Sequence, residues 1–286
     1  MGPLKAQSSR KSRKEEILTL LRREADWYSG EIISSVLGIS RAAVAKHITS
    51  LRQDGHAIDA APRRGYRLLA ELDQLDLNAL IPLMNTNLIG CREWRFLPES
   101  SSTNTEALLW AAEGACEGSV VYAEHQTKGR GRKGHGWHSL PRGLQFSVIL
   151  RPSSHGESHE LLTPLGVVAV AEAIRDTTGL EAKVKEPNDV LVNGHKISGV
   201  LVETGFRGGE ADWVVLGIGC NVNAVMDDFP HEIRGSAGSL LLEASRTVAR
   251  APLFATILER LEYWYACLDG NRRLLEARYA ELLLHL

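Results

Sequence analysis

Residues 185–203 read K-E-P-N-D-V-L-V-N-G-H-K-I-S-G-V-L-V-E, and this stretch decides the fold of the chain around it. Two apolar runs rich in valine, leucine and isoleucine flank Asn193-Gly194, a dipeptide typical of a tight β-hairpin turn. Pro187 keeps the residues before it extended, so the polar side chains around it project from a strand end. Lys196 lies one step into the returning strand. The stretch predicts a hairpin that carries either a functional site or an ordinary turn with an exposed lysine.

A second informative stretch, residues 126–137, reads Q-T-K-G-R-G-R-K-G-H-G-W. Its four glycines allow positive φ angles and close approach of the backbone to a ligand. Arg130 and Arg132 offer planar forks for carboxylate or phosphate oxygens, and Trp137 offers a face for a flat ring. No anionic partner for the arginines is evident in the sequence. The alternative is a solvated basic loop or a nucleic-acid patch.

A third stretch, residues 217–223, reads G-I-G-C-N-V-N and follows an apolar strand-like run at residues 213–216. Two glycines within a buried strand indicate that a ligand or another backbone comes close, or that the strand has a bulge. The pattern is no dinucleotide fingerprint, because the third glycine and the following helix are missing.

Together with residues 101–105 (S-S-T-N-T), these segments resemble the biotin protein ligases in order and spacing. The resemblance covers Trp94 to Tyr265, and the amino-terminal region extends it to the bifunctional members, which are both ligases and repressors of biotin genes. It implies a catalytic core similar to that of class II aminoacyl-tRNA synthetases.

The resemblance also implies an activity. Such enzymes use ATP and Mg²⁺ to form biotinyl-5'-AMP and transfer biotin to a lysine of biotin carboxyl carrier protein. Biotin is then both substrate and effector, and the adenylate-bound protein is expected to be a homodimer on operator DNA. Two anions must meet at the α-phosphorus, so the first step requires fixed cations.

By this resemblance the chain's candidate site residues fall into three overlapping groups. The catalytic candidates are Lys196, Arg132, Lys185 and Asp189. The biotin-binding candidates are Ser102, Thr103, Asn104, Gln126, Gly129, Arg130, Gly131, Arg132, Lys196, Gly217 and Gly219. The ATP-binding candidates are Arg132, Trp137, Lys185, Asn188 and Asn221, and no metal-ligand set is assigned.

The resemblance gives these residues roles. Lys196 would hold the biotin carboxylate and α-phosphate oxygens, Arg132 the phosphate and Lys185 the outer phosphates. Trp137 would cover the adenine, and Asp189 would position the incoming amine or the metal. The two asparagines would bind nucleotide or metal, and the glycine-rich loop would be disordered when empty and fold over the adenylate.

The chain departs from the family pattern in three places. Glu186 replaces the usual aromatic residue before Pro187, and His135 replaces a usual arginine. The sequence ends at Leu286 in the terminal helix, so we expect the small carboxy-terminal β-barrel of the family to be absent. The absent barrel and Glu186 favour an alternative, a biotin- or adenylate-sensing transcription regulator with little or no ligase activity, whereas the retained lysines and arginines favour the ligase. A related lipoate-attaching enzyme is a third possibility.

The amino-terminal region predicts a winged helix-turn-helix. Helices are expected at residues 15–24, 31–37 and 41–53, with a glycine turn at Gly38 and an N-cap at Ser40. Residues 57–59 and 66–69 would pair as the wing. In the third helix, Ala42, Ala43, Val44, Ile48 and Leu51 are expected to face inward. The DNA-binding candidates are Arg41, Lys46, His47, Arg52, Arg63 and Arg64. The alternative is a small dimerisation or sensor module.

Composition and charge agree with an intracellular DNA-binding protein. The net charge of the 286 residues is −2, but residues 1–70 hold thirteen Lys/Arg against seven Asp/Glu, which leaves −8 for the rest. No apolar run is long enough for a membrane span, and the amino terminus lacks a signal-peptide pattern. The four cysteines lie far apart and indicate neither disulfides nor zinc. We expect a cytoplasmic protein without membrane partners.

The predicted fold class is α+β, with helices packed on one largely antiparallel sheet. Residues 1–72 are expected to form the winged helix-turn-helix, with 1–13 disordered. Residues 73–90 are expected to be a linker with a short helix at 77–84. Residues 91–286 are expected to form the catalytic domain, with a long helix at 160–178 and two terminal helices at 253–268 and 272–284.

Overall fold

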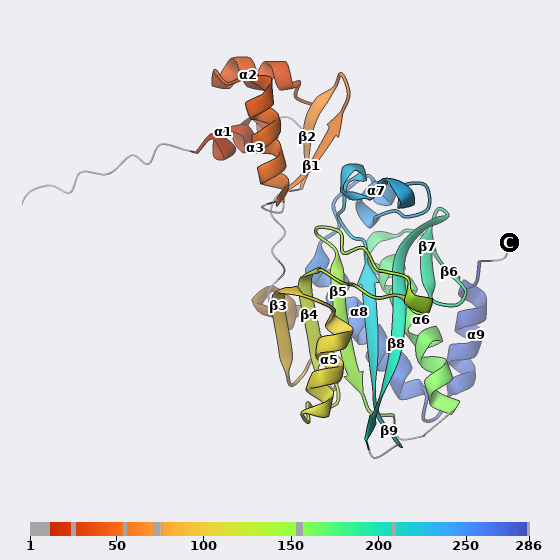
Figure 1. Ribbon diagram of the computed structural model, residues 1–286. Coiled ribbons are helices and arrows are strands. Elements are labelled where there is room, and N and C mark those ends of the chain that lie inside the picture. The colour runs from red at the N-terminus through yellow and green to blue at the C-terminus, as the bar shows by residue number, and fades with distance from the viewer. Residues whose placement is uncertain are drawn as a thin grey trace, which may run out of the picture. The chain divides into compact units, whose positions relative to one another are not determined.

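The computed structural model describes residues 12–23, 27–53, 56–70, 75, 77–152, 157–207 and 210–284. The chain divides into two compact units, an N-terminal unit (Met1–Asp73) and a C-terminal unit (Gln74–Leu286). Figure 1 shows the elements of both. Most of the segment predicted to be disordered lies outside the described residues, but α1 already begins at Arg13, whose guanidinium pairs with Glu16.

The described residues of the N-terminal unit form three helices and a β-hairpin, as predicted. Its elements are α1 (Arg13–Arg23), α2 (Gly30–Leu37), α3 (Arg41–Gln53), β1 (Ala57–Ala61) and β2 (Gly65–Ala70). Ser29 accepts a hydrogen bond from the backbone of Ile32 and caps α2, and Ser40 accepts one from Ala43 at the start of α3. Gly38 ends α2 with a φ of 62°, a conformation that glycine adopts without strain. These local signals account for the agreement.

The inward face of α3 is narrower than predicted. Val44, Ile48 and Leu51 are buried in the core of this unit, at the spacing of one helix face. Ala42 is exposed. Arg52 does not project outward as predicted, because its Nε donates to the carbonyl of Ile58 on β1 at 2.7 Å. Arg52 therefore links the third helix to the wing.

The wing is a two-stranded antiparallel hairpin in which Ala61 pairs with Gly65. At its tip, Arg63 has a φ of 65°. The guanidinium carbon of Arg64 lies 4.6 Å from the ring centroid of Trp27, and this cation–π contact orients the arginine.

The C-terminal unit is built on a seven-stranded sheet with the order β3-β4-β5-β9-β8-β7-β6. Only the β3–β4 pair is parallel among the described strands. The strands are β3 (Trp94–Ser100), β4 (Val120–Gln126), β5 (Leu144–Leu150), β6 (Ala182–Lys185), β7 (Asp189–Val192), β8 (His195–Arg207) and β9 (Glu210–Cys220). The hairpin predicted at residues 185–203 is present as β7 and β8, with positive φ angles at Asn193 and Gly194.

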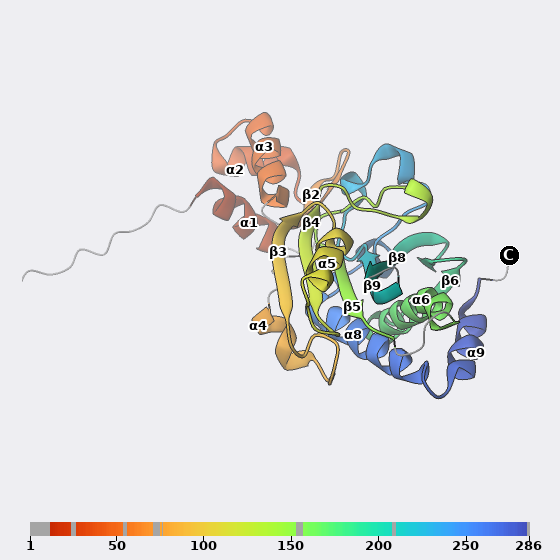
Figure 2. The same ribbon diagram turned by 60° about the horizontal axis from the view of Figure 1, so that its bottom comes forward.

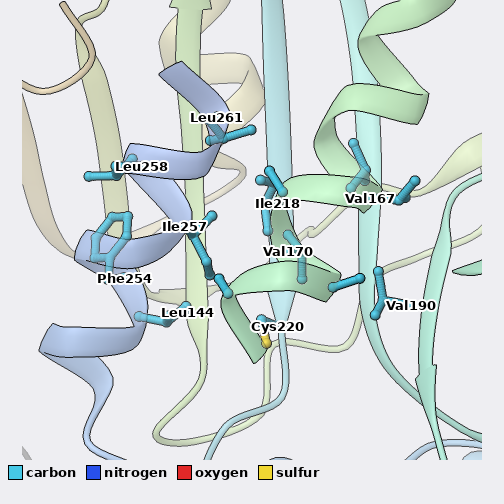
Figure 3. Packing of buried hydrophobic residues seen from close by; sticks show 14 of the residues in the cluster. Leu144, Val167, Val170, Val190, Ile218, Cys220, Phe254, Ile257, Leu258 and Leu261 are labelled. Atoms are coloured by element: carbon cyan, nitrogen blue, oxygen red, sulfur yellow. The ribbon is translucent and has the colours of Figure 1, made fainter. Parts of the chain in front are cut away.

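Helices cover both faces of this sheet, which confirms the predicted α+β class (Figures 1 and 2). One face packs against α5 through Ala107 and Ala111, and the other against α6, α8 and α9. Figure 3 shows Ile257 of α8 and Val170 of α6 on the side of the sheet where Ile218 of β9 lies. The helices are α4 (Leu77–Leu80), α5 (Thr103–Ala112), α6 (Glu157–Thr178), α7 (Leu240–Ala244), α8 (Arg250–Cys267) and α9 (Arg272–Leu282). Short 3-10 turns span Ile81–Leu83, Arg132–Gly134, Met226–Asp228 and His231–Ile233.

The segment expected to be a linker belongs instead to the C-terminal unit from Leu75 onward. Leu75, Leu80 and Ile89 are buried in its main core. The carboxylate of Glu262 on α8 accepts hydrogen bonds from the backbone N–H groups of residues 87, 88 and 89, at 2.7, 2.8 and 2.8 Å. Apolar burial and these three bonds therefore fix the segment to α8.

Among the described residues α9 is the last helix or strand, and no helix there is both long enough and apolar enough to cross a membrane.

Candidate functional site

A cavity of about 220 Å³ opens on the face of the sheet that α5 also covers. Its floor is made of Gly199 and Leu201 on β8 and of their cross-strand partners Gly219 and Gly217 on β9. The amino end of α5 and the loop of residues 126–137 supply further lining. The three motifs of the sequence analysis therefore meet at one place, together with the Ser-Thr-Asn segment.

Two positions of β9, 217 and 219, have room only for glycine, because side chains of other residues lie directly against the strand there. A Cβ atom at Gly217 would stand 1.9 Å from Asn104 Oδ1, and one at Gly219 would stand 2.3 Å from the indole of Trp137. The close approach predicted for these glycines is present, but the neighbours are side chains rather than another backbone. Either substitution by alanine would have to displace a residue that lines the cavity.

A buried polar network forms the wall next to α5. Gln126 Oε1 accepts from the backbone N–H of Thr103 at 2.7 Å and from its hydroxyl at 3.1 Å. The hydroxyl of Ser147 on β5 lies 2.8 Å from Thr103 Oγ1 and 2.6 Å from Asn104 Oδ1. Ser147 was not predicted, although a serine inside a strand whose residues are all buried is an indication of such a role.

The glycine-rich loop folds into a small hairpin-like turn. Gly131 donates to the carbonyl of His135 at 2.7 Å, and Trp137 donates to that of Gly129 at 2.9 Å. Lys133 adopts a positive φ of 54° in the turn. Of the biotin-binding candidates, Gly129 alone is absent from the lining of this cavity among the described residues.

Arg130 has an anionic partner that the sequence did not reveal. Its Nη2 lies 2.9 Å from Glu203 Oε2 on β8. The expectation that the loop arginines lack such a partner is therefore wrong for Arg130. Arg132 lines the cavity, and no ion pair of Arg132 occurs within the described part of the chain.

A second cavity of about 330 Å³ adjoins the first, and Gly136, Trp137, Asp189 and Lys196 line both. It receives the remaining ATP-binding candidates, Lys185 from the end of β6 and Asn221 after β9. Leu140, Ile233 and Ala237 add apolar groups to its wall, and Ser236 adds a polar one. Sequence reasoning missed these residues, because they carry no motif.

Lys196 is held firmly at the junction of the two cavities. Its backbone N–H donates to Ser236 and its carbonyl accepts from Gly238, at 2.8 and 3.0 Å. Its ammonium lies 2.6 Å from Asp189 Oδ1, as an ion pair without aligned hydrogen-bond geometry. The same Nζ lies 5.9 Å from the ring centroid of Trp137.

The two asparagines are oriented by backbone carbonyls. Asn188 donates to Val200 at 2.8 Å and lines the first cavity, not the second. Asn221 donates to Gly238 at 3.0 Å, which leaves its buried Oδ1 without a hydrogen-bond partner among the described residues. That oxygen is available to a ligand donor or a cation. The neighbouring thiol of Cys220 is fully buried, and burial raises its pKa to about 12, so it is no nucleophile.

The two departures from the family motif lie in different surroundings. Glu186 lines neither cavity and accepts from the hydroxyl of Tyr279 on α9 at 3.4 Å. Burial and the charge of Glu186 raise the pKa of this tyrosine. His135 does line the first cavity. The acidic residue therefore stands away from the proposed anion sites.

This mixed sheet, whose glycine floor carries a cavity lined by a cationic loop, belongs to a chain that matches the ligases of the biotin and lipoate class. The biotin/lipoate A/B protein ligase family model matches residues 96–221, and an HTH domain model matches residues 13–67. The bifunctional ligase/repressor BirA of Bacillus subtilis (strain 168) is 37% identical over 254 residues, which are 88% of this chain and 78% of that protein. The BirA of Escherichia coli (strain K12) is 30% identical over 85% of this chain and 74% of its own. This chain belongs to the bifunctional biotin ligase/repressor family.

A solved structure supports the same assignment. The biotin protein ligase from Aquifex aeolicus, in complex with biotin and ATP, superposes with a TM-score of 0.61 and 29% identity. The match covers 68% of this chain and 80% of that one.

Proposed function

We propose that this protein is an ATP-dependent biotin ligase that forms biotinyl-5'-AMP, transfers biotin to a lysine of a carrier protein, and represses transcription as a DNA-binding protein in the cytoplasm. The observation that carries the proposal is the pair of adjoining cavities with Lys196 at their junction. A ligand that enters both would place its reacting bond beside that ammonium. A simple DNA-binding module does not require this arrangement.

The proposed roles follow from position. The first cavity would hold the ring and chain of biotin against the glycine floor, and the second would hold the nucleotide. Lys196 and Arg132 would neutralise the carboxylate and α-phosphate that must approach each other, and Lys185 would contact the outer phosphates. Trp137 lies on the boundary of the cavities, so its ring would cover the bound chain as well as the nucleotide side.

The residues of the second cavity fit a magnesium ion that arrives with the nucleotide. No group of three His, Cys, Asp or Glu able to hold a metal exists among the described residues. Asp189 and the unpartnered Oδ1 of Asn221 would supply oxygen ligands, which agrees with the few protein ligands that Mg²⁺ takes beside phosphates. The ion would neutralise phosphate charge.

One experiment separates ligase from sensor. The chain is incubated with ATP, Mg²⁺, labelled biotin and a biotin carboxyl carrier domain, and label on the carrier is measured alongside biotin-dependent pyrophosphate exchange. Labelling of the carrier is expected. Exchange without labelling would indicate a sensor that stops at the adenylate, and exchange with lipoate alone would indicate the related lipoate enzyme.

Replacing Arg41 and Lys46 of α3 with alanine is expected to weaken operator binding and to leave biotin affinity unchanged. Both side chains are exposed, so they can reach phosphates or base edges without cost to the core. Each lost phosphate contact should lower the slope of log affinity against log salt by about 1. Binding is measured by fluorescence anisotropy at several salt concentrations. The same change at Arg95 and Arg175 of the C-terminal unit is the control, and equal DNA affinity in both double variants would contradict the assignment.

Biotin together with ATP is expected to favour a homodimer and to protect the loop at residues 128–133 from protease. Ligand bonds to the loop backbone would add to the internal bonds that Gly131, His135 and Trp137 donate. Because coupling is reciprocal, operator DNA should in turn tighten adenylate binding. Sedimentation and proteolysis are compared for the chain alone, with biotin, and with biotin and ATP. Identical behaviour in the three samples would remove the support for ligand-controlled repression.

A further inference from the structure

Glu203 connects two walls of the first cavity although it lines neither cavity itself. Its Oε2 accepts from Asn104 Nδ2 at 2.7 Å and from Arg130 Nη2 at 2.9 Å. Both partners line the first cavity. One carboxylate therefore joins the amino end of α5 to the glycine-rich loop.

The strand register explains why the carboxylate stands there. Side chains alternate along β8, so Gly199, Leu201 and Glu203 share one face. The first two form the floor of the cavity opposite Gly219 and Gly217, and Glu203 follows one pair further along the same face. The carboxylate thus marks the end of the floor.

Glu203 also fixes the orientation of the Asn104 amide. The Nδ2 group donates to Glu203 and, at 3.3 Å, to the carbonyl of Leu201. The Oδ1 atom faces the hydroxyl of Ser147 at 2.6 Å. A rotated amide would turn its oxygen toward the Glu203 carboxylate, where two acceptors would face each other. The polar network of the wall, from Arg130 to Gln126, therefore depends on one anion.

The same contact cancels the charge of Arg130. The side chain of Glu203 is 26% exposed and that of Arg130 is 41% exposed, so the pair is partly shielded from water. The surface of the first cavity also includes Arg132, which has no ion pair within the described residues. The Arg130–Glu203 pair is thus neutral, as is the Lys196–Asp189 pair at the junction, and Arg132 carries a positive charge that no ion pair among the described residues offsets.

We propose that Glu203 is a positioning residue that keeps this end of the cavity neutral, so that an uncharged ring enters there and the substrate carboxylate is directed to Lys196 and Arg132. The inference rests on the proposed biotin ligase function and adds a residue that determines substrate orientation. Without Glu203, the guanidinium of Arg130 would compete with Lys196 and Arg132 for the substrate carboxylate. The substrate would then be held in the reversed orientation.

The test is Glu203→Gln, which keeps the shape and an acceptor for Asn104 but leaves Arg130 unpaired. Biotin-dependent pyrophosphate exchange is expected to slow on the order of tenfold, because a reversed or displaced carboxylate cannot attack. Arg130→Met, which leaves Glu203 without its ion-pair partner, should also slow pyrophosphate exchange. The double variant Arg130→Met/Glu203→Gln restores neutrality and should be faster than Glu203→Gln alone, which a merely structural role would not produce.

The control is Glu113→Gln, which removes an exposed ion pair with Arg95 outside both cavities. Thermal melting of each variant shows whether it is folded, and Arg130→Met tests the same pair if Glu203→Gln does not fold. Native exchange rates in Glu203→Gln, or a double variant slower than Glu203→Gln, would overturn the inference. Absence of exchange in the unaltered chain would instead overturn the proposed function.

Discussion

Replacing Lys196 with alanine is expected to raise the activation free energy of adenylate formation by about 3–4 kcal/mol, while nucleotide affinity changes little. The ammonium stands at the junction of the two cavities, where a carboxylate and a phosphate would have to approach each other. A fixed cation at that position stabilises the transition state more than either bound reactant. Pyrophosphate exchange gives the rate, and equilibrium binding of ATP gives the affinity.

The matched control is Lys183→Ala, since this lysine lies on β6, which β7 separates from β8 in the same sheet, and lines neither cavity. Its exchange rate should equal that of the unaltered chain. A Lys196→Ala variant with near-native exchange would make Lys196 an ordinary strand lysine, the alternative that its sequence context left open. Removal of Lys196 also frees Asp189 from its ion pair, so Lys196→Arg should recover part of the rate.

Replacing Arg250 with methionine is expected to lower the free energy of unfolding of the C-terminal unit by about 3 kcal/mol. This arginine, at the start of α8, is 1% exposed. Its Nη1 lies within 3.2 Å of Tyr122 Oη, 2.7 Å of Glu124 Oε1 and 3.0 Å of the Gly143 carbonyl. Methionine keeps much of the apolar stem but leaves these acceptors without their donor.

Urea unfolding followed by tryptophan fluorescence measures the effect, because of the six tryptophans only Trp27 belongs to the N-terminal unit. Arg260→Met is the control, since Arg260 is 40% exposed and its short contact, at 2.6 Å, is with the surface residue Asp176, while the buried Glu172 lies 3.8 Å away. Such exposed pairs contribute about 0–1 kcal/mol. Equal losses in the two variants would show that burial of Arg250 does not govern its contribution.

The sequence predicted those parts of the fold that local chemistry determines. Ser29, Gly38 and Ser40 mark helix ends through their own backbone and side-chain bonds, and Asn193-Gly194 marks the hairpin turn in the same way. The motif glycines and lysines were also visible, because a ligand site that bends the backbone leaves unusual residues close together in the chain.

Contacts between distant residues were not predictable in this way. Glu203 lies 73 residues after Arg130, and nothing beside either residue indicates the other. Arg52 looked like an outward-facing helix residue until the wing supplied a carbonyl acceptor at Ile58. The residues at 233–237 reach the second cavity only because Lys196 forms backbone bonds with that segment. Tertiary pairing, rather than local preference, places all of these groups.

The three backbone hydrogen bonds that Glu262 accepts help to locate the boundary at which the N-terminal, DNA-binding unit could be exchanged for another. A catalytic fragment that began at residue 91 would lose Leu80 and Ile89 from its core and leave the Glu262 carboxylate without its donors. One that began at Gln74 would keep both. When DNA-binding units are exchanged between proteins, by recombination or in the laboratory, the exchangeable unit therefore ends at Asp73. The short helix α4 that follows belongs to the catalytic unit.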